Sequence, residues 1–269
     1  MIKIETVKTD TFSMDFFRFG HGGQTLVILP GLSVQSVMPS AEAIRQAYGI
    51  FEDGYTVYVF DRRKELPAEY SVYGMAEDTS RALDTLGLHK TNILGVSQGG
   101  MIAMALAINN PDAVEKLVLC STCARVLPAQ FNTIQKWVNN AKAKKTRELY
   151  LDFGRALYPA DVFESSRELL TGAAKTVTDG DLNRFITLAE GTRDFDVEKD
   201  IEKIACPVLL IGSRDDRVLG AHAVLQTAKR FESRRSFNLY MYDGYGHAVY
   251  DTAPDFKERV LRFLREKRI

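Results

Sequence analysis

Short apolar runs recur along the chain, and most of them are followed by a mixed segment long enough for a helix. The runs occupy residues 25–29 (TLVIL), 56–60 (TVYVF), 92–96 (NILGV), 116–119 (KLVL), 208–211 (VLLI) and 238–242 (NLYMY). Continuous aliphatic and β-branched runs of this length are typical of strands that are covered on both faces. Helix-length segments such as 73–86 and 98–109 lie between them. The alternation predicts a mostly parallel sheet of about eight strands with helices on both faces.

Two departures from this rhythm refine the prediction. Near the N-terminus, a short polar turn joins residues 3–7 to residues 12–19, which favours an antiparallel start to the sheet. From about residue 127 the strand-like runs stop, and helical stretches follow at 128–145, 146–158, 159–171 and 179–190. We therefore expect an α/β core formed by residues 1–124 and 193–269, interrupted by a lid of about four helices at 125–192.

The sequence GVSQGG at residues 95–100 is the most informative stretch of the chain. It contains the pattern G-x-S-x-G directly after a predicted buried strand and before a helix that is apolar on nearly every face. In a nucleophile elbow the serine occupies such a strand–turn–helix junction, and small neighbours let the strand and the helix approach closely. This context favours Ser97 as a nucleophile over a glycine-rich turn with an incidental serine.

A serine hydroxyl is a poor nucleophile without a base, and the chain offers four histidines. His21 lies in a polar turn, and His89 lies in a connection that leads into a strand, at the edge opposite the elbow. His222 opens an amphipathic helix. His247 follows the last predicted strand, at the carboxyl edge of the sheet, where ligands bind in open α/β folds. His247 is therefore the predicted general base.

The base in turn needs a carboxylate that orients the imidazole and stabilises its protonated form. The strand at 208–211 leads to two adjacent acids, Asp215 and Asp216, whereas the residues directly after the strand at 116–119 include no acid. The acid is therefore expected after the later strand. Either of the two aspartates satisfies this argument.

With these residues, the chain resembles the α/β-hydrolase superfamily over essentially its whole length, in the lidded group of small esterases, lactonases and C–C bond hydrolases. In that group the acid lies nine residues after the proline that opens its strand and four before the Pro or Gly that starts the next helix. Counted from Pro207 and from Gly220, both spacings select Asp216. Asp215 remains the second choice for the acid. If Asp216 is the acid, Asp215 is expected to be a solvated neighbour or a helix cap.

The resemblance also implies an oxyanion hole formed by the backbone amides of Gln98 and Leu32. Many members carry His-Gly at the end of the strand before Leu32, whereas this chain has Pro30 and Gly31. Because the main chain supplies the donors, Pro30 does not abolish the hole, although the chain lacks a histidine that often braces the loop.

A further charged run, DRR at residues 61–63, follows another predicted strand at the same edge of the sheet. The resemblance allows an arginine near the pocket rim that meets a substrate carboxylate. The sequence favours the simpler interpretation, a solvated turn held by ion pairs.

Composition narrows the range of partners. Lys and Arg balance Asp and Glu at 35 each, so no global field favours nucleic acid or an anionic membrane. No stretch approaches the roughly 20 apolar residues of a membrane span, and the first ten residues lack the apolar core of a signal peptide. Three cysteines, Cys120, Cys123 and Cys206, form an odd set, which predicts reduced thiols in the cytoplasm. The CxxC spacing of the first two has no second ligand pair nearby, so no metal is expected.

These observations predict a serine hydrolase that cleaves a small ester, thioester or lactone through an acyl-enzyme. No cofactor is expected, because neither a Walker-type nor a GxGxxG motif is present. Two alternatives remain: a C–C bond hydrolase that uses the same three residues, and a ligand-binding protein that retains the pocket. A dehalogenase of the usual kind is excluded, because Ser97 stands where that chemistry requires an aspartate. The sequence leaves the natural substrate and the oligomeric state open.

Overall fold

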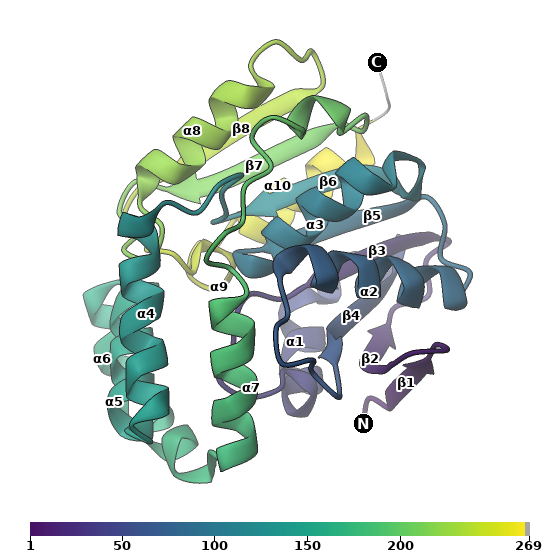
Figure 1. The fold of residues 1–269 in the computed structure, drawn as a ribbon. Helices are drawn as coiled ribbons and strands as arrows, with labels where there is room; N and C mark the ends of the chain where they lie inside the picture. The colour runs from purple at the N-terminus through teal and green to yellow at the C-terminus, as the bar shows by residue number, and fades with distance from the viewer. Residues whose placement is uncertain (267–269) are drawn as a thin grey trace.

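An eight-stranded sheet runs through the protein, whose computed structural model describes residues 1–266 (Figure 1). Its spatial order is β1-β2-β4-β3-β5-β6-β7-β8; the pairs β1–β2 and β2–β4 are antiparallel, and all the others are parallel. The strands are β1 (Ile4–Lys8), β2 (Ser13–Phe19), β3 (Gln24–Leu29), β4 (Tyr55–Arg63), β5 (Thr91–Val96), β6 (Val114–Cys120), β7 (Val208–Ser213) and β8 (Phe237–Tyr242). The predicted fold class, a mostly parallel sheet with an antiparallel start, is confirmed.

Helices cover both faces of the sheet, and each face has its own hydrophobic core. On one face lie α2 (Val72–Thr85), α3 (Gln98–Asn109) and α8 (Ala221–Phe231). On the other lie α1 (Ala41–Tyr48), α9 (Val249–Thr252) and α10 (Phe256–Arg265). Successive residues of a strand point to opposite faces, so in β5 Ile93 joins the first core while Leu94 and Val96 join the second. This double burial explains why the central strands are apolar without alternation.

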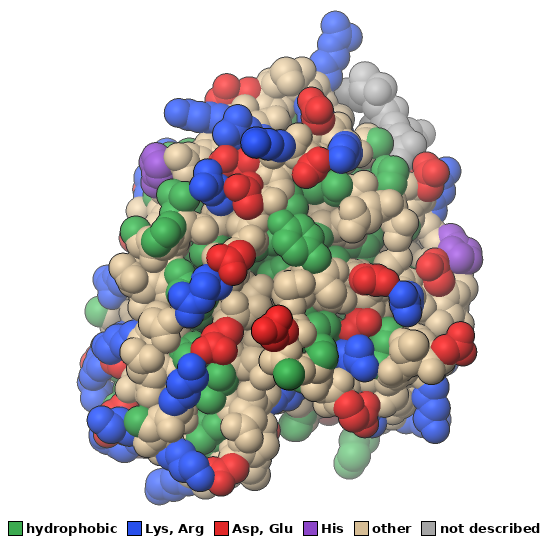
Figure 2. Space-filling model, in the orientation of Figure 1, with side chains coloured by type: hydrophobic (Ala, Val, Ile, Leu, Met, Phe, Trp, Pro, Cys, Tyr) green, Lys and Arg blue, Asp and Glu red, His purple; other side chains and the backbone are tan. Residues whose placement is uncertain are grey.

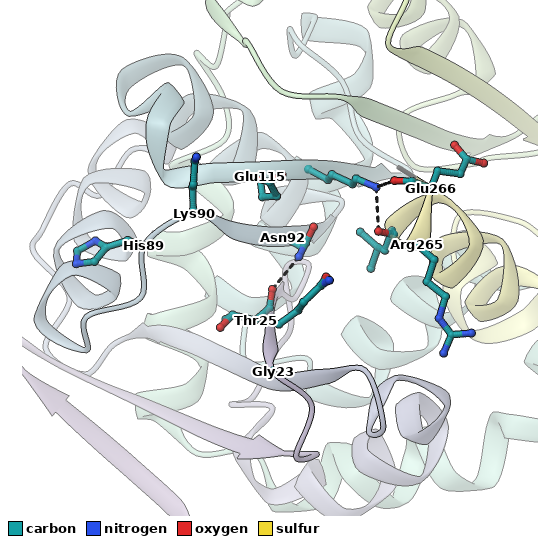
Figure 3. Close-up of a pocket in the computed structure, with 11 residues that line it drawn as sticks. Gly23, Thr25, His89, Lys90, Asn92, Glu115, Arg265 and Glu266 are labelled. Atoms are coloured by element: carbon teal, nitrogen blue, oxygen red, sulfur yellow. Dashed lines mark hydrogen bonds between the residues drawn. The ribbon is translucent and has the colours of Figure 1, made fainter. Parts of the chain in front are cut away.

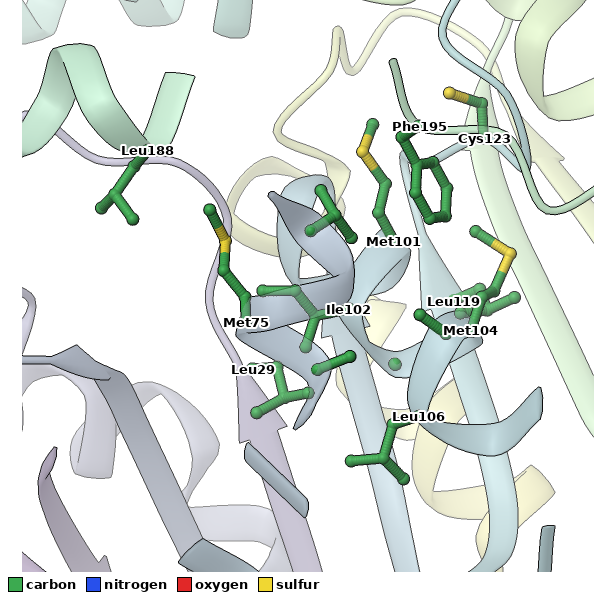
Figure 4. Packing of buried hydrophobic residues seen from close by; sticks show 14 of the residues in the cluster. Leu29, Met75, Met101, Ile102, Met104, Leu106, Leu119, Cys123, Leu188 and Phe195 are labelled. Carbon is green, nitrogen blue, oxygen red and sulfur yellow. The ribbon is translucent and has the colours of Figure 1, made fainter. Parts of the chain in front are cut away.

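Helix α3 is the most buried helix beside the sheet, and every residue from Gln98 to Ala107 is buried. Its side chains pack between the sheet and α2, as Figure 4 shows for Ile102 beside Met75 and Leu29. Burial on all sides accounts for the lack of an amphipathic pattern in this helix. It also fixes the end of α3 that follows Ser97.

A group of four helices stands to one side of the sheet (Figure 1). In the chain, these helices lie between β6 and β7. They are α4 (Pro128–Lys142), α5 (Thr146–Leu157), α6 (Ala160–Ala173) and α7 (Asp179–Glu190). Aromatic rings pack inside the group: the ring centroids of Trp137 and Phe153 lie 4.5 Å apart, and those of Phe153 and Phe185 lie 6.3 Å apart. The chain enters and leaves through one short antiparallel bridge between Arg125 and Asp196. The helices therefore form an insertion whose entry and exit lie side by side.

Several boundaries differ from the sequence-based expectation. Strand β4 continues to Arg63, so the charged run at 61–63 lies in the strand and not in a solvated turn. Helix α4 ends at Lys142, three residues earlier than predicted, and α10 starts at Phe256 instead of at residue 254. The predicted end of that last helix, residue 267, lies outside the described residues. Within residues 1–266, none of the helices combines the length and apolar character that a membrane crossing demands.

Candidate active site

Ser97 sits at a sharp turn between the end of β5 and the start of α3. Its backbone angles are φ 51° and ψ −117°, a region that side-chain-bearing residues rarely adopt. The turn is fixed on both sides, because the Ser97 amide donates to the carbonyl of Cys120 at 2.8 Å and the Thr122 hydroxyl donates to the carbonyl of Ser97 at 2.8 Å. The predicted elbow is thus present as a strained but well-anchored turn.

Close backbone approach explains the glycines on either side of Ser97. A Cβ atom on Gly99 would lie 1.9 Å from the carbonyl oxygen of Leu29, at the end of the neighbouring strand β3. A Cβ atom on Gly95 would lie 2.5 Å from the carbonyl oxygen of Gly99. Neither position can hold a larger residue unless the backbone moves, so both glycines are needed for the turn.

The structure brings the predicted base and acid to the predicted nucleophile. His247 Nε2 lies 3.0 Å from Ser97 Oγ, and His247 Nδ1 lies 2.8 Å from Asp216 Oδ2. Ser97 follows β5, Asp216 follows β7 and His247 follows β8. All three strands end at the same edge of the parallel sheet. The imidazole is 1 % exposed, while Ser97 is only partly buried and so remains accessible. A hydroxyl, an imidazole and a carboxylate in this series can move a proton away from the serine.

Asp216 is held in the ionised form that such a series requires. Burial alone would raise its pKa, but the neighbouring His247 and the hydrogen bonds to the carboxylate outweigh this effect and lower the pKa below its usual value. The second carboxylate oxygen, Oδ1, accepts the backbone amides of Val218 at 2.7 Å and Leu219 at 3.0 Å. Every oxygen of this buried carboxylate therefore has a partner.

Asp215, the second choice for the acid, has a different position. Its Oδ1 accepts hydrogen bonds from the Ser213 hydroxyl and from the amide of Gly244 at 2.9 Å, and its Oδ2 accepts from the amide of Gly246 at 2.9 Å. Desolvation raises its pKa, and these bonds lower it by more, so the net pKa lies below the usual value. Asp215 thus anchors the loop that carries His247 and does not contact the imidazole.

Two hydroxyl residues at the end of β6 contribute to the site although the sequence analysis found only the absence of an acid there. The Ser121 hydroxyl donates to the backbone carbonyl of His247 at 2.6 Å, and Thr122 holds the elbow as described above. Ser121 itself has a positive φ of 48°. Such an unusual backbone angle has no signature in a Cys-Ser-Thr-Cys segment, so the sequence offered no signal for this brace.

The two backbone amides predicted for an oxyanion hole belong to residues close to Ser97: Gln98 follows it directly, and Leu32 follows Gly31. Within residues 1–266, neither the Leu32 nor the Gln98 amide donates a hydrogen bond to the protein. The Gln98 amide opens helix α3, whose N-terminus carries a partial positive charge. Leu32 follows Gly31, whose Cα lies close enough that an added Cβ would be 3.2 Å from Ser97 Cβ. Two unused donors beside the serine are suited to an anionic oxygen.

The remaining histidines lie elsewhere. His21 and His89 are exposed and lie 3.8 Å and 3.9 Å from surface aspartates, and His222 lies in the first turn of α8. His89 lines a cavity of about 580 Å³ at the opposite edge of the sheet, together with Lys90 and Asn92 (Figure 3). That cavity is therefore separate from the candidate site.

No metal-ligand cluster competes with this interpretation in the described part of the chain. Residues 1–266 hold no group of three or more His, Cys, Asp or Glu side chains arranged for a metal ion, and all three cysteines are buried thiols outside any disulfide. Acidic and basic side chains are mixed over the face seen in Figure 2.

Comparison with known proteins agrees with the geometry. The sequence profile described as the alpha/beta hydrolase fold matches residues 24–254. The chain therefore belongs to the α/β-hydrolase family. Because its relatives are named as hydrolases and lactonases and it shares their fold, the protein is a hydrolase.

Relatives cover nearly the whole chain. "Putative carbamate hydrolase RutD" from Caulobacter sp. is 28% identical and covers 91% of this chain and 93% of its own length. The 3-oxoadipate enol-lactonase 2 of Acinetobacter baylyi is 22% identical, with 91% and 94% covered. The crystal structure of an alpha/beta hydrolase enzyme from a Medee basin deep-sea metagenome library has a TM-score of 0.86 at 22% identity, with 98% of both chains covered. The structural likeness shows the fold.

The elbow geometry leads to a first prediction. Gly99→Ala should destabilise the protein by about 2–3 kcal/mol, because its methyl group would overlap the Leu29 carbonyl and force the backbone apart. Gly172→Ala is the matched control, since an added Cβ there meets no atom within 4 Å in helix α6 and should be neutral or slightly stabilising. Urea unfolding measures both; equal stability of the two variants would contradict the packing argument.

The two aspartates give a second prediction. Asp216→Asn should lower kcat by about 10³–10⁴-fold, because the imidazole loses the carboxylate that orients and stabilises it. Asp215→Asn should cost less than about tenfold, with its main effect on the loop that carries His247. Steady-state turnover of a nitrophenyl ester distinguishes them, and equal or reversed losses would contradict the assignment.

Asp215 should instead show itself in the dependence of stability on pH. The folded pKa of Asp215 is lowered, so its carboxylate stabilises the protein at any pH above the ordinary aspartate pKa. This contribution is lost as the pH falls from the ordinary pKa through the lower, folded pKa. Asp215→Asn should therefore be about 1 kcal/mol less stable than wild type at pH 7, a modest value because solvent partly screens the group. Unfolding measured from pH 7 to pH 3 should show the gap closing; a constant gap would contradict this role.

Proposed function

We propose that the protein is a serine hydrolase that cleaves a small ester, thioester or lactone through an acyl-enzyme on Ser97. The observation that carries the proposal is the unbroken hydrogen-bonded series from Ser97 through His247 to Asp216, with two unused backbone amides beside the hydroxyl. The names of the relatives support it, because a lactonase and a carbamate hydrolase both act at an acyl carbon.

In the first half of the reaction, His247 Nε2 takes the proton of the Ser97 hydroxyl while Oγ attacks the carbonyl carbon. The carbonyl oxygen becomes an anion, and the amides of Leu32 and Gln98 donate hydrogen bonds to it. The Asp216 carboxylate stays ionised throughout, accepts a hydrogen bond from Nδ1–H of His247 and stabilises the imidazolium. The imidazolium then returns the proton to the leaving group, which departs and leaves an acyl-enzyme.

In the second half, water replaces the leaving group. His247 accepts a proton from the water molecule, whose oxygen attacks the acyl carbon, and the same two amides hold the second oxyanion. Collapse of this intermediate releases the acid and returns the proton to Ser97 Oγ. All proton transfers use the one imidazole, so no metal or cofactor is required.

The insertion α4–α7 is proposed to act as the lid of the site, with the core at 1–124 and 193–269. It meets the loop after β3, where the Tyr150 hydroxyl donates to Gln35 Oε1 at 2.8 Å. It also meets the loop that carries His247, since the Ala248 amide donates to the carbonyl of Leu157 at 3.0 Å. Contacts on both sides of Ser97 support an enclosed site and hence a small substrate. Three buried cysteines without a disulfide support the cytoplasm as the compartment.

The fourth prediction tests the nucleophile. A fluorophosphonate should label the wild-type protein and leave Ser97→Ala unlabelled, because the reagent forms a covalent bond only with an activated serine. Gel fluorescence and intact mass measure the label. Ser165→Ala is the matched control, since this exposed serine lies on α6, where its hydroxyl donates to the Val162 carbonyl at 2.9 Å, and its loss should leave Ser97 reactive.

The chemistry of the substrate is tested with a panel of nitrophenyl esters of increasing chain length and with a vinylogous diketone. Turnover of the short esters alone would support the acyl-enzyme hydrolase. Cleavage of the diketone in preference to every ester would instead support the C–C bond hydrolase. A wild-type protein that is neither labelled nor active would favour the ligand-binding alternative.

A further inference from the structure

A buried arginine that the mechanism has not used lies next to the candidate oxyanion hole. Arg62 is near the end of β4, and the residue is 5 % exposed. Burial lowers the pKa of its guanidinium to about 10, against the opposing effect of the neighbouring Asp61, so it still carries a charge at neutral pH. The sequence favoured a solvated turn at this position, and the longer strand β4 corrects that expectation.

One nitrogen of this arginine connects the two segments that would form the hole. Arg62 Nη2 donates to the carbonyl oxygen of Pro30 at 2.7 Å and to Oε1 of Gln98 at 3.2 Å. Pro30 lies two residues before Leu32, and Gln98 carries the other predicted donor on its own backbone. The guanidinium thus contacts both segments that carry the predicted donors, the loop after β3 and the start of α3.

The amide group of Gln98 extends this connection to the helical insertion. Its Nε2 donates to the carbonyl of Leu188 in α7 at 2.7 Å, while its Oε1 accepts from Arg62. The buried Gln98 side chain therefore uses both its donor and its acceptor, and its position is fixed by two partners. Fixing this side chain also fixes the residue whose backbone amide opens α3.

Stability alone does not explain a charge at this position. Within residues 1–266, no carboxylate lies within 4.0 Å of the Arg62 guanidinium, and its buried Nε has no hydrogen-bond partner. The adjacent Asp61 is instead occupied by Arg184, with a nitrogen–oxygen distance of 2.5 Å, and by the Ser36 hydroxyl at 2.6 Å. A buried cation without an ion-pair partner is costly to keep.

We propose that Arg62 is a positioning residue that holds the Leu32 and Gln98 amides in the arrangement required by the oxyanion. The proposal rests on the proposed function. Gly31, between Pro30 and Leu32, has no side chain to restrict it, so an anchored Pro30 carbonyl limits how the Leu32 amide can turn. Donors in an oxyanion hole must lie about 2.7–3.1 Å from the developing anion, so a small displacement weakens them.

The fifth prediction compares Arg62→Met and Arg62→Lys on a neutral nitrophenyl ester and on one with a carboxylate in its acyl chain. Arg62→Met should lower kcat by about tenfold on both esters, less than the loss of a whole hole donor, with KM changed less than about twofold. Binding of a trifluoromethyl ketone, which forms a tetrahedral oxyanion with Ser97, should weaken by a similar factor. Arg62→Lys should recover part of the loss, since an ammonium can still donate to the Pro30 carbonyl.

The neighbouring Arg63→Met serves as the matched control. Arg63 donates to the Thr11 carbonyl at 3.2 Å and pairs with Asp78 at 3.5 Å, away from the hole, so its variant should lose stability while kcat stays within about twofold of wild type. Thermal unfolding of both variants separates a loss of folded protein from a loss of catalysis.

Three results would overturn the inference. A higher KM confined to the carboxylate-bearing ester would mean that Arg62 binds an anionic substrate group. Ser97-dependent turnover with unchanged kcat in Arg62→Met would mean that the arginine only fills space. Activity that survives Ser97→Ala would overturn the proposed function itself, and the positioning role with it.

Discussion

The contact between the start of α3 and the end of β3 is the constraint on which the site depends. A Cβ atom on Gly99 would lie only 1.9 Å from the Leu29 carbonyl oxygen, so the start of α3 packs directly against the end of β3. Helix α3 must therefore begin immediately after β5, which leaves no room for a relaxed turn. Ser97 is therefore held at φ 51°, a strained angle that the buried helix α3 stabilises. The strain places the hydroxyl above the sheet edge, beside the unused amide of Gln98.

Parallel strands make the rest of the site possible, because their carboxyl ends share one edge. Asp216 and His247 come from the ends of β7 and β8, yet they reach a serine that is 150 residues away in the chain from the histidine. Topology brings the loops together, and local hydrogen bonds then set the distances. Asp215 and Ser121 illustrate this: one holds the amides before His247, and the other holds its carbonyl. The imidazole is thus oriented by its backbone as well as by its acid.

The sequence was sufficient for the features that depend on local pattern. Apolar runs located the core strands, and the G-x-S-x-G junction located Ser97. Its place after the last strand, at the carboxyl edge of the sheet, selected His247 among the histidines. What it missed depends on the direction in which side chains point. Because β4 continues to Arg63, the two-residue period of a strand turns Arg62 towards the interior, whereas a turn at the same place would have exposed it. Strand ends are set by pairing with neighbouring strands, which a single sequence does not encode locally.

The bonds around Gln98 link the predicted hole to the part of the chain that differs most from the sheet. Through Gln98 Nε2 the start of α3 is tied to α7, and through Oε1 it is tied to β4 by way of Arg62. If the proposed mechanism holds, a shift of α7 would therefore act on the Gln98 amide that is assigned to the oxyanion. On the proposed mechanism, substitutions in α7 that move the Leu188 carbonyl would change kcat, because the Gln98 side chain bonded to that carbonyl belongs to the residue whose amide would hold the oxyanion.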